Sequence, residues 1–259
     1  MFQDKMVTTA TPERVYELCK LIEKEPLSTD KLREKMEPEY LQNKTSYFSA
    51  YRNAAEELKL ISITDNTISL AVDPLVVKNM SSMRRYVNSI IAEFENGPFY
   101  KVTQQYFSMG TEILKTNKSV SELAPTMSRR LDTPIDAQGM LGWRFWASFL
   151  GVGYLQNTFL IPNAKNFLWD AIQNAGLEQN QSYSFSEFVD RIYGSCEIIF
   201  GTNRSKRELN YGVSNGLRAL HNAGQIKLEH IHDQADNWTL YPMKAHSIQD
   251  TVTNITVCK

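Results

Sequence analysis

The stretch SYFSAYRNAAEELKLISITDNTISL, residues 46–70, changes its periodicity part-way along and so decides the fold of the first third of the chain. Its first part places apolar residues on one face of a helix, at Phe48, Tyr51, Ala55 and Leu58. From Ile61 onward, apolar and polar residues alternate as they do in strands, and Asp65-Asn66 is a turn sequence. The stretch therefore predicts a helix followed by a two-stranded hairpin.

Two shorter helices precede this stretch. Thr11-Pro12-Glu13 is a helix start, because a capping hydroxyl is followed by proline at the first helical position and by an acid. Pro26 ends that helix, and Ser28 or Thr29 caps the next one. Three helices followed by a hairpin is the element order of a winged helix, a relative of the helix-turn-helix. We predict a winged helix at residues 1–74, and the alternative is a generic small α+β domain.

The end of the third helix is echoed twice further along the chain. The three copies are Ala55–Ile61, Phe149–Leu155 and Leu220–Ile226. In this alignment Lys59, Gly153 and Gly224 follow the helix end, where a left-handed residue is needed and glycine is least strained. Lys59 is the imperfect member, so we expect a different or strained turn there.

The last copy has the clearest local signals. Ser184-Phe185-Ser186-Glu187 is a capping box, and a helix follows at about residues 210–223. Residues 226–231 alternate like a strand, and Trp238–Tyr241 reads as the returning strand. We predict a second winged helix within residues 164–259, with a wide wing.

Residues 75–163 form a middle segment with weaker signals. A helix at 75–95 connects it to the first unit, and further helices are predicted at 99–114 and from Ser119 to Leu131. An aromatic helix and a short hairpin complete it. Two interpretations stay open, a degenerate third winged helix and an all-helical linker domain. The predicted fold class is mainly α with small β wings: tandem winged-helix domains joined by this middle domain.

The composition excludes several classes of protein. Lys and Arg number 28 and Asp and Glu 29, so the net charge is -1 and bulk charge cannot hold the chain on nucleic acid. Three widely spaced cysteines give no disulfide framework, which fits a reducing cytoplasm. There is no apolar run of about 18 residues, so we expect no membrane span.

No catalytic motif stands out in the sequence. There is no glycine-rich phosphate loop with a following Lys-Ser or Lys-Thr, and no Gly-x-Ser-x-Gly elbow. His230 and His232 share one face of a predicted strand, but a third metal ligand is missing. We therefore predict a protein that is not an enzyme, with no catalytic residue, no metal and no cofactor.

Basic residues gather ahead of the third helix of the last unit. The candidate DNA contacts are Arg204, Lys206, Arg207, Asn210 and Arg218, with a smaller cluster at Arg129 and Arg130 in the middle segment. Such side chains suit phosphates and base edges, although an ordinary solvated loop is the alternative. In the first unit, Glu56 and Glu57 lie within the third helix and would repel phosphate, which favours a protein-binding surface there.

The aromatic run from Trp143 to Phe149 has two interpretations. Its helical spacing favours a role in the core. The alternative is an exposed docking patch for a partner protein, formed by Trp143, Arg144 and Trp146, because aromatic residues and arginine are enriched in interface hot spots.

The segment Gly142–Tyr154, followed by Phe159–Pro162 and flanked by two predicted winged helices, carries a resemblance of layout. It resembles the tandem winged-helix partners of SMC-type ATPase complexes and the accessory subunits of bacterial anti-phage systems, including Lamassu-type systems. The resemblance implies a non-enzymatic subunit that bridges an SMC-like ATPase and a nuclease effector and contacts double-stranded DNA. The competing class is a stand-alone winged-helix regulator or plasmid replication initiator. An enzyme with a dispersed site comes third.

Overall fold

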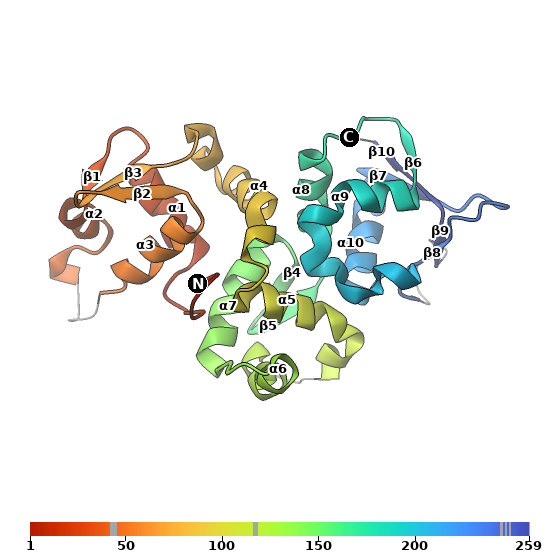
Figure 1. Cartoon of the computed structure of the whole chain (residues 1–259), viewed down its shortest axis with the longest axis horizontal. Helices are drawn as coiled ribbons and strands as arrows, with labels where there is room; N and C mark the ends of the chain where they lie inside the picture. Colours follow the sequence, from red (N-terminus) through yellow and green to blue (C-terminus); the bar gives the residue numbers. More distant parts are fainter. Residues whose placement is uncertain (42–45, 116–118, 244–245, 247, 249, 259) are drawn as a thin grey trace.

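A computed structural model describes residues 1–41, 46–115, 119–243, 246, 248 and 250–258, without the side chains of residues 41 and 202–204. The protein is mainly helical with small antiparallel sheets, which confirms the coarse fold class. Figure 1 shows three groups of elements, with α1–α3 at one end, α5–α7 in the middle and α8–α10 at the other end. We call them the first repeat (residues 11–71), the second repeat (98–163) and the third repeat (164–258).

The first repeat has the predicted helices and hairpin. Thr11 caps the first helix by accepting a hydrogen bond from the N–H of Arg14, as the sequence indicated. A short strand that the sequence did not reveal joins the hairpin, and the sheet order is β1-β3-β2. The elements are α1 (Pro12–Leu21), β1 (Leu27–Ser28), α2 (Thr29–Met36), α3 (Phe48–Glu57), β2 (Ile61–Thr64) and β3 (Thr67–Leu70).

The second repeat has three helices and a hairpin, but its helices are broken. The helix predicted at 99–114 ends early, because Gly110 takes a left-handed φ of 55°. The helix predicted from Ser119 begins as a 3-10 turn. The elements are α5 (Pro98–Ser108), η4 (Gly110–Lys115), η5 (Val120–Leu123), α6 (Ala124–Leu131), α7 (Ala137–Leu150), β4 (Gly153–Gln156) and β5 (Phe159–Pro162).

The third repeat closes its sheet with a strand that the sequence did not reveal. β10 (Asn254–Val257) lies between β6 (Ser182–Ser184) and β7 (Ile226–Glu229), in the order β6-β10-β7. The predicted returning strand was wrong, because β8 (Trp238–Thr239) pairs with β9 (Thr251–Val252) instead. The helices are α8 (Lys165–Asn174), α9 (Phe185–Phe200) and α10 (Tyr211–Asn222), with η6 (Gly201–Lys206) before α10.

The same backbone hydrogen bond closes the end of the third helix in all three repeats. The bonds are Leu60 N to Ala55 O at 3.0 Å, Val152 N to Ala147 O at 3.1 Å and Gln225 N to Leu220 O at 3.0 Å. The preceding residue is left-handed each time: Lys59, Gly151 and Gly224 have φ of 55°, 81° and 64°. The alignment that used Gly153 was therefore wrong by two residues, because α7 ends at Leu150.

Two more backbone hydrogen bonds recur in the repeats. One leads from the residue after the last strand to the start of the first wing strand, as Ala71 N to Leu60 O, Asn163 N to Val152 O and Cys258 N to Gln225 O. The other joins the second helical segment to the wing, as Thr29 N to Asn66 O, Val120 N to Thr158 O and Phe185 N to Thr253 O. The middle segment is thus a further copy of one backbone pattern.

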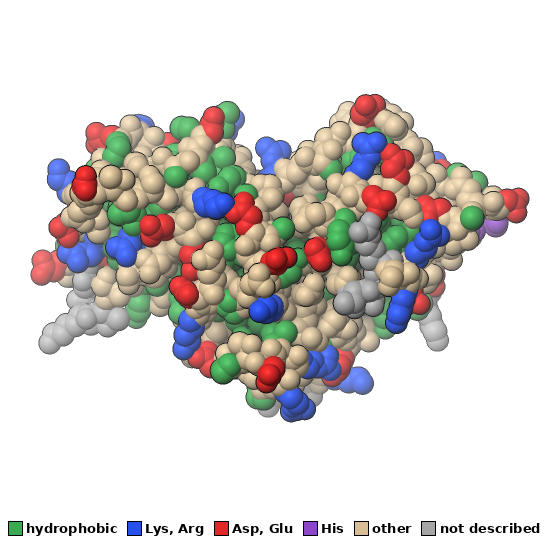
Figure 2. Space-filling model, viewed as in Figure 1, with side chains coloured by type: hydrophobic (Ala, Val, Ile, Leu, Met, Phe, Trp, Pro, Cys, Tyr) green, Lys and Arg blue, Asp and Glu red, His purple; other side chains and the backbone are tan. Residues whose placement is uncertain are grey.

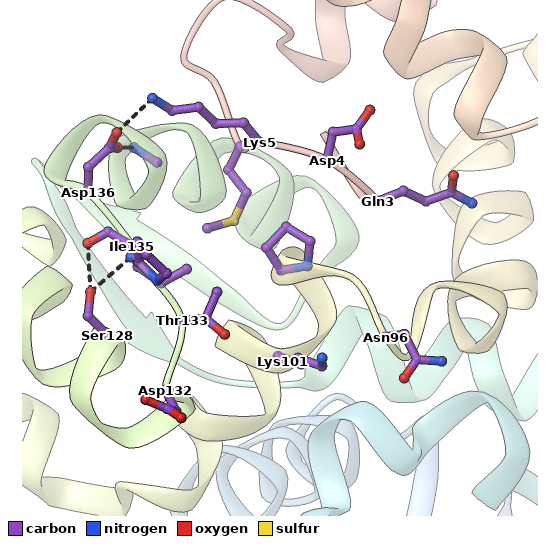
Figure 3. A pocket seen from close by; sticks show the side chains of 14 residues that line it. Gln3, Asp4, Lys5, Asn96, Lys101, Ser128, Asp132, Thr133, Ile135 and Asp136 are labelled. Atoms are coloured by element: carbon purple, nitrogen blue, oxygen red, sulfur yellow. Dashed lines mark hydrogen bonds and ion pairs between the residues drawn. The ribbon is translucent and has the colours of Figure 1, made fainter.

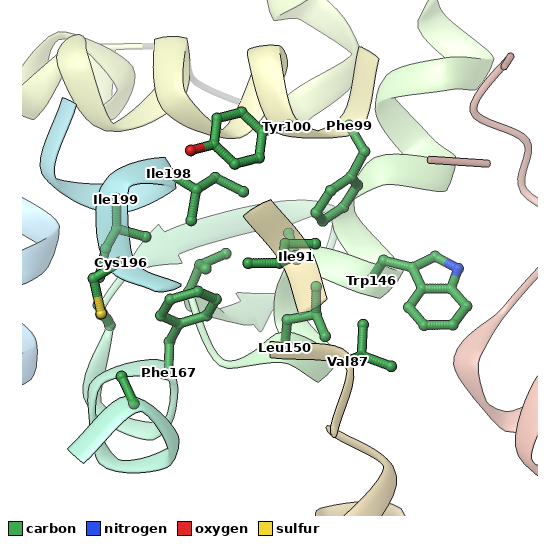
Figure 4. Close-up of a cluster of buried hydrophobic side chains, with 14 of the residues drawn as sticks. Val87, Ile91, Phe99, Tyr100, Trp146, Leu150, Phe167, Cys196, Ile198 and Ile199 are labelled. Carbon is green, nitrogen blue, oxygen red and sulfur yellow. The ribbon is translucent and has the colours of Figure 1, made fainter. Parts of the chain in front are cut away.

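A separate helix, α4 (Met80–Ile90), connects the first repeat to the others. It lies between η2 (Pro74–Val77) and η3 (Ile91–Phe94), and these three pieces replace the single helix predicted at 75–95. Asn79 caps α4 by accepting from the N–H of Ser82 at 2.8 Å. Apolar side chains from α4, α5, α7, α8 and α9 meet in one core (Figure 4).

A buried ion pair holds α4 against α8. Asp170 of α8 is only 3% exposed, and it accepts from Arg84 Nε at 2.7 Å and from Arg84 Nη2 at 3.0 Å. The amide of Asn88 donates to the same carboxylate at 2.9 Å. These bonds satisfy a carboxylate that would otherwise be costly to bury, so α4 is fixed to the third repeat.

Candidate functional site

The third helix of the third repeat, α10, has almost no free surface. A Cβ added at Gly212 would lie 2.5 Å from the Phe107 ring, and one at Gly216 would lie 2.7 Å from the backbone of Ala164. The amide of Asn215 donates to the carbonyl of Pro162 at 3.2 Å. α10 therefore packs against the second repeat and α8, and it has no open face with which to enter a DNA groove.

Two of the residues predicted to contact DNA are structural. Arg218 is 2% exposed, and its guanidinium donates to Tyr241 O at 2.7 Å and to Asp250 Oδ1 at 2.8 Å. Burial lowers the pKa of Arg218, although Asp250 opposes this. Asn210 caps α10 by accepting from Val213 N at 3.0 Å, and it donates to a carbonyl of α9. Neither side chain is available to DNA in this arrangement, so both predictions were wrong.

The rest of the predicted basic run has mixed surroundings. Lys206 is exposed, and the side chain of Arg204 lies outside the described residues. Arg207 lies 3.5 Å from Asp236 and donates to Ala235 O at 3.3 Å. This run is therefore not a continuous set of free cations.

The second predicted basic cluster lies on α6. Arg129 is exposed, and Arg130 donates to both oxygens of Glu112 at 3.0 and 2.9 Å. Both arginines occupy the last turn of α6, where the helix dipole favours cations. Figure 1 shows α6 and α10 in different parts of the molecule, so the structure does not bring the two predicted clusters together.

The two tryptophans predicted for partner docking are in the core. Trp143 and Trp146 are fully buried, and their indole N–H groups donate to Thr103 Oγ1 at 2.9 Å and to Ala10 O at 2.5 Å. The core interpretation is confirmed, and the docking prediction for these two residues was wrong. The aromatic run reflects a helix that is covered on more than one side.

Arg144 differs from its two neighbours in the predicted patch. Its guanidinium lies 4.8 Å from the centre of the Phe145 ring. Its Nε and Nη1 atoms are buried without a hydrogen-bond partner in the described part of the chain, and burial lowers the pKa of Arg144. It is the one member of the predicted patch that is not already fully bonded within the fold.

The outward face of α7 is covered by the N-terminal segment, residues 1–10. A Cβ at Gly142 would lie 2.6 Å from the carbonyl of Val7, and the nearest side chain to Gly139 other than Asp136 is Met6. Glycines at these positions allow the segment to approach the helix backbone closely. The third helix of the second repeat is therefore covered as well.

The third helix of the first repeat, α3, keeps its outward face open. Ser49, Asn53 and Glu56 are exposed, and Arg52 is partly exposed. Of the two acids expected on this helix, Glu57 points inward, with 12% of its side chain exposed and a bond from Phe2 N at 2.8 Å. Sequence reasoning counted both acids on the surface, because it could not see which face the helix buries.

The carboxylate of Glu37 accepts hydrogen bonds from residues at the start of α3. Glu37 accepts from Ser46 Oγ at 2.7 Å, from Tyr47 N at 3.0 Å and from Tyr51 OH at 3.1 Å. Burial and the Glu37 charge raise the pKa of Tyr51. Tyr47, at this end of the helix, is 41% exposed, and Tyr40, in the 3-10 turn η1 (Glu39–Leu41) after α2, is 84% exposed. The guanidinium of Arg14 lies over the Tyr47 ring at 5.4 Å.

The described residues hold no group of three or more His, Cys, Asp or Glu that could bind a metal ion. The buried thiols of Cys19 and Cys196 have pKa values raised to about 12 by burial, so neither is a ready nucleophile at neutral pH. In the described part of the chain, no helix is long and apolar enough to cross a membrane.

Charge is spread unevenly along the chain and mixed on the surface. Residues 1–74 hold ten Lys and Arg against thirteen Asp and Glu, whereas residues 75–163 hold nine against six. Figure 2 shows acidic and basic side chains interspersed over the viewed face.

No family model, curated protein or solved structure matches the chain.

Proposed function

We propose that the chain is a non-catalytic accessory subunit, built from three winged-helix units, that docks a partner protein through α3. The repeated strand order β1-β3-β2 and β6-β10-β7, and the backbone bonds shared with the second repeat, support the winged-helix assignment. Winged helices commonly bind through the third helix. The observation that carries the proposal is that α3 is open whereas α7 and α10 are covered.

The chemistry around α3 favours a protein over a nucleic acid. Tyr47 and Arg52 are of two residue types, tyrosine and arginine, that recur in interface hot spots. The net charge of residues 1–74 is -3, from ten basic and thirteen acidic residues, and this disfavours phosphate. The resemblance in layout to accessory subunits of anti-phage complexes makes an SMC-like ATPase, with a nuclease effector, the first partner to test.

The test is recovery of the partner with a tagged protein from the native host, at moderate salt and after nuclease treatment. The double variant Ser49→Lys/Asn53→Lys places two long cations on the open face, and lysine is a good helix former, so the variant should fold and lose the partner. The matched control Gln179→Lys/Gln181→Lys adds the same charge at exposed positions of the third repeat and should keep it. Equal recovery with both variants would refute docking at α3.

A second function has one observation in its favour. Because Glu57 points inward, Glu56 is the one acid left beside Arg52 and Asn53 on the open face of α3. A stand-alone DNA-binding regulator or replication initiator would use this face to read DNA. The variant Ser49→Lys/Asn53→Lys separates the two functions, since it should weaken a protein complex and strengthen DNA binding.

A further inference from the structure

The N-terminal segment, residues 1–10, is held on the fold mainly by its side chains. It belongs to no helix or strand, and among the described residues no backbone–backbone hydrogen bond joins it to another segment. Its buried side chains include Phe2, which is 0% exposed, and Met6, which is 3% exposed, whereas residues 3–5 between them are exposed. The attachment of the segment therefore depends on anchors that flank an exposed stretch.

The first anchor is the ring of Phe2, which lies among three other aromatic side chains. The centre of this ring is 4.9 Å from those of Phe99 and Trp146 and 5.4 Å from that of Phe94. Tilted and edge-on contacts at such distances are the arrangements that aromatic rings favour. The site therefore fits an aromatic side chain at this position.

The backbone at Phe2 is contacted from two sides. Its N–H donates to Glu57 Oε2 at 2.8 Å, and the Glu57 side chain is only 12% exposed. A Cβ added at Gly97 would lie 1.8 Å from the carbonyl oxygen of Phe2, so a side chain there would exclude the segment. The carboxylate and the glycine together fix the register of the segment.

The second anchor lies four residues further on, against α7. The methyl group of Met6 is 3.7 Å from a Cβ added at Gly139. Between the anchors, Lys5 pairs with Asp136 at 2.8 Å, and Figure 3 shows its amine directed to that carboxylate. The surface thus accommodates a pattern: an aromatic residue, a basic residue three positions later and an apolar residue directly after it.

The stretch between the anchors is weakly held. Residues 3–5 lie beside an open groove of about 1020 Å³, whose other walls include the start of α5 and the turn that joins α6 to α7 (Figure 3). The side chains of Lys5 and Asp136 are 70% and 51% exposed, and such pairs contribute little to stability. Because the segment shares no backbone hydrogen bond with a described helix or strand, it can leave without breaking one.

We propose that this surface is a peptide-binding site, which residues 1–7 fill in the free chain, and that a segment of a partner protein exchanges with them. The partner segment carries the same pattern: an aromatic side chain that packs on Phe99 and Trp146, a basic one that pairs with Asp136, and an apolar one on α7. The chain's own segment competes at a local concentration on the order of millimolar. The site uses the inward side of α3 and not its open face, so either proposal can fail without the other.

The probe is a peptide of residues 1–10 with a fluorescent label at its carboxyl end, titrated against the full chain by fluorescence anisotropy. Phe2→Ala in the chain weakens its own segment, so we expect the peptide to bind this variant at least about tenfold more tightly than the unaltered chain. A peptide that itself carries Phe2→Ala should bind the same variant at least about tenfold more weakly than the unaltered peptide. A Lys5→Glu peptide should lose a smaller factor, because its pair is exposed.

A matched pair of glycine variants tests the place of binding. In the Phe2→Ala chain, Gly142→Ala puts a methyl group 2.6 Å from the Val7 carbonyl position and should abolish saturable peptide binding. Gly194→Ala, on an exposed part of α9 where an added Cβ would contact no other segment within 4 Å, should leave binding unchanged. Alanine is the better helix former, so both variants should fold, and circular dichroism checks this.

A second measurement does not depend on changing Phe2. In the otherwise unaltered chain, Gly142→Ala should speed tryptic cleavage after Lys5, and Gly194→Ala should not. Equal peptide affinity for the unaltered and Phe2→Ala chains, no saturable binding to the Phe2→Ala chain, or equal effects of the two glycine variants in either measurement would each overturn the proposal.

Discussion

α3 and α10 occupy the same place in two copies of one backbone pattern, yet one is open and the other is covered. The register set by the shared hydrogen bonds aligns Tyr47 of the first repeat with Gly139 of the second and Gly212 of the third. Tyr47 is 41% exposed, whereas both glycines lie close to atoms of other segments. The size of one side chain at the start of the helix thus separates a free surface from an internal contact.

The comparison extends to the polar residues of these helices. Asn53 of α3 is exposed, and its counterpart in α10 is Arg218, which is buried and bonded to the wing. A polar or basic residue on a third helix therefore does not by itself predict DNA contact, because the prediction also depends on which face of the helix is covered. The same backbone leaves an open surface in one repeat and forms a packing surface in another.

The largest expected effect comes from giving α10 the residue that α3 carries. Gly212→Tyr would drive a side chain into Phe107 and Pro162, and we expect it to lower the free energy of unfolding by more than about 3 kcal/mol. Urea unfolding followed by circular dichroism measures this. The reciprocal change, Tyr47→Gly, should cost far less because that side chain is half exposed. A Gly212→Tyr protein as stable as the original would show that α10 is not packed as described.

The next largest effect on stability contrasts a buried ion pair with an exposed one. Asp170→Ala leaves Arg84 without its buried carboxylate, and we expect a loss of roughly 3–5 kcal/mol in the free energy of unfolding. Asp30→Ala removes a pair with Arg33 that is exposed on both sides, and it should cost less than about 1 kcal/mol. Thermal or urea unfolding of both variants checks the contrast, and similar losses would contradict it.

A smaller effect tests the residue that the sequence assigned to DNA. Arg218→Met keeps much of the apolar stem but removes the bonds to Tyr241 and Asp250, so we expect a loss of about 2 kcal/mol in stability. The equivalent change in α3, Asn53→Met, should stay within about 0.5 kcal/mol of the original protein, because the side chain is exposed. If Arg218→Met instead left stability unchanged and reduced DNA binding, the structural role of Arg218 would be wrong.

The smallest effect lies at the helix starts. Asp136 caps α7, whereas α3 begins at Tyr47 without a side-chain cap, so Asp136→Ala should cost about 1 kcal/mol. The bond from Lys5 and the N–H of Gly139 lower the pKa of Asp136. A lowered folded-state pKa means that the contribution is complete above the ordinary value of about 4 and is lost as the pH falls through the lowered value. Unfolding at pH 7 and pH 3 should therefore show a smaller cost of Asp136→Ala at the lower pH.

Local signals in the sequence predicted local structure well. The caps at Thr11 and Ser184 and the hairpin around Asp65-Asn66 are confirmed, because a cap or a turn depends on a few neighbouring residues. The left-handed residue after the third helix was also foreseen, although in the second repeat it is Gly151 rather than Gly153. Such features need no knowledge of distant segments.

Local sequence signals could not show that the face of α3 is open while that of α10 is covered. Whether α10 is open depends on Phe107 and Pro162, which precede Gly212 by many residues in the sequence and meet it only in the folded protein. No local pattern reveals such a contact. One signal was present, since Gly212 and Gly216 are four residues apart on one helix face and mark a close approach.

The position of β10 in the third sheet has a consequence for the order in which the protein is made. In the first repeat the central strand follows its neighbour after Asp65 and Asn66, whereas in the third repeat the residues from 230 to 253 lie between β7 and β10. Closing that longer loop costs more chain entropy, and long-range strand pairing is slow. During synthesis the first sheet can form early, but the third stays without its middle strand until residues 254–257 leave the ribosome.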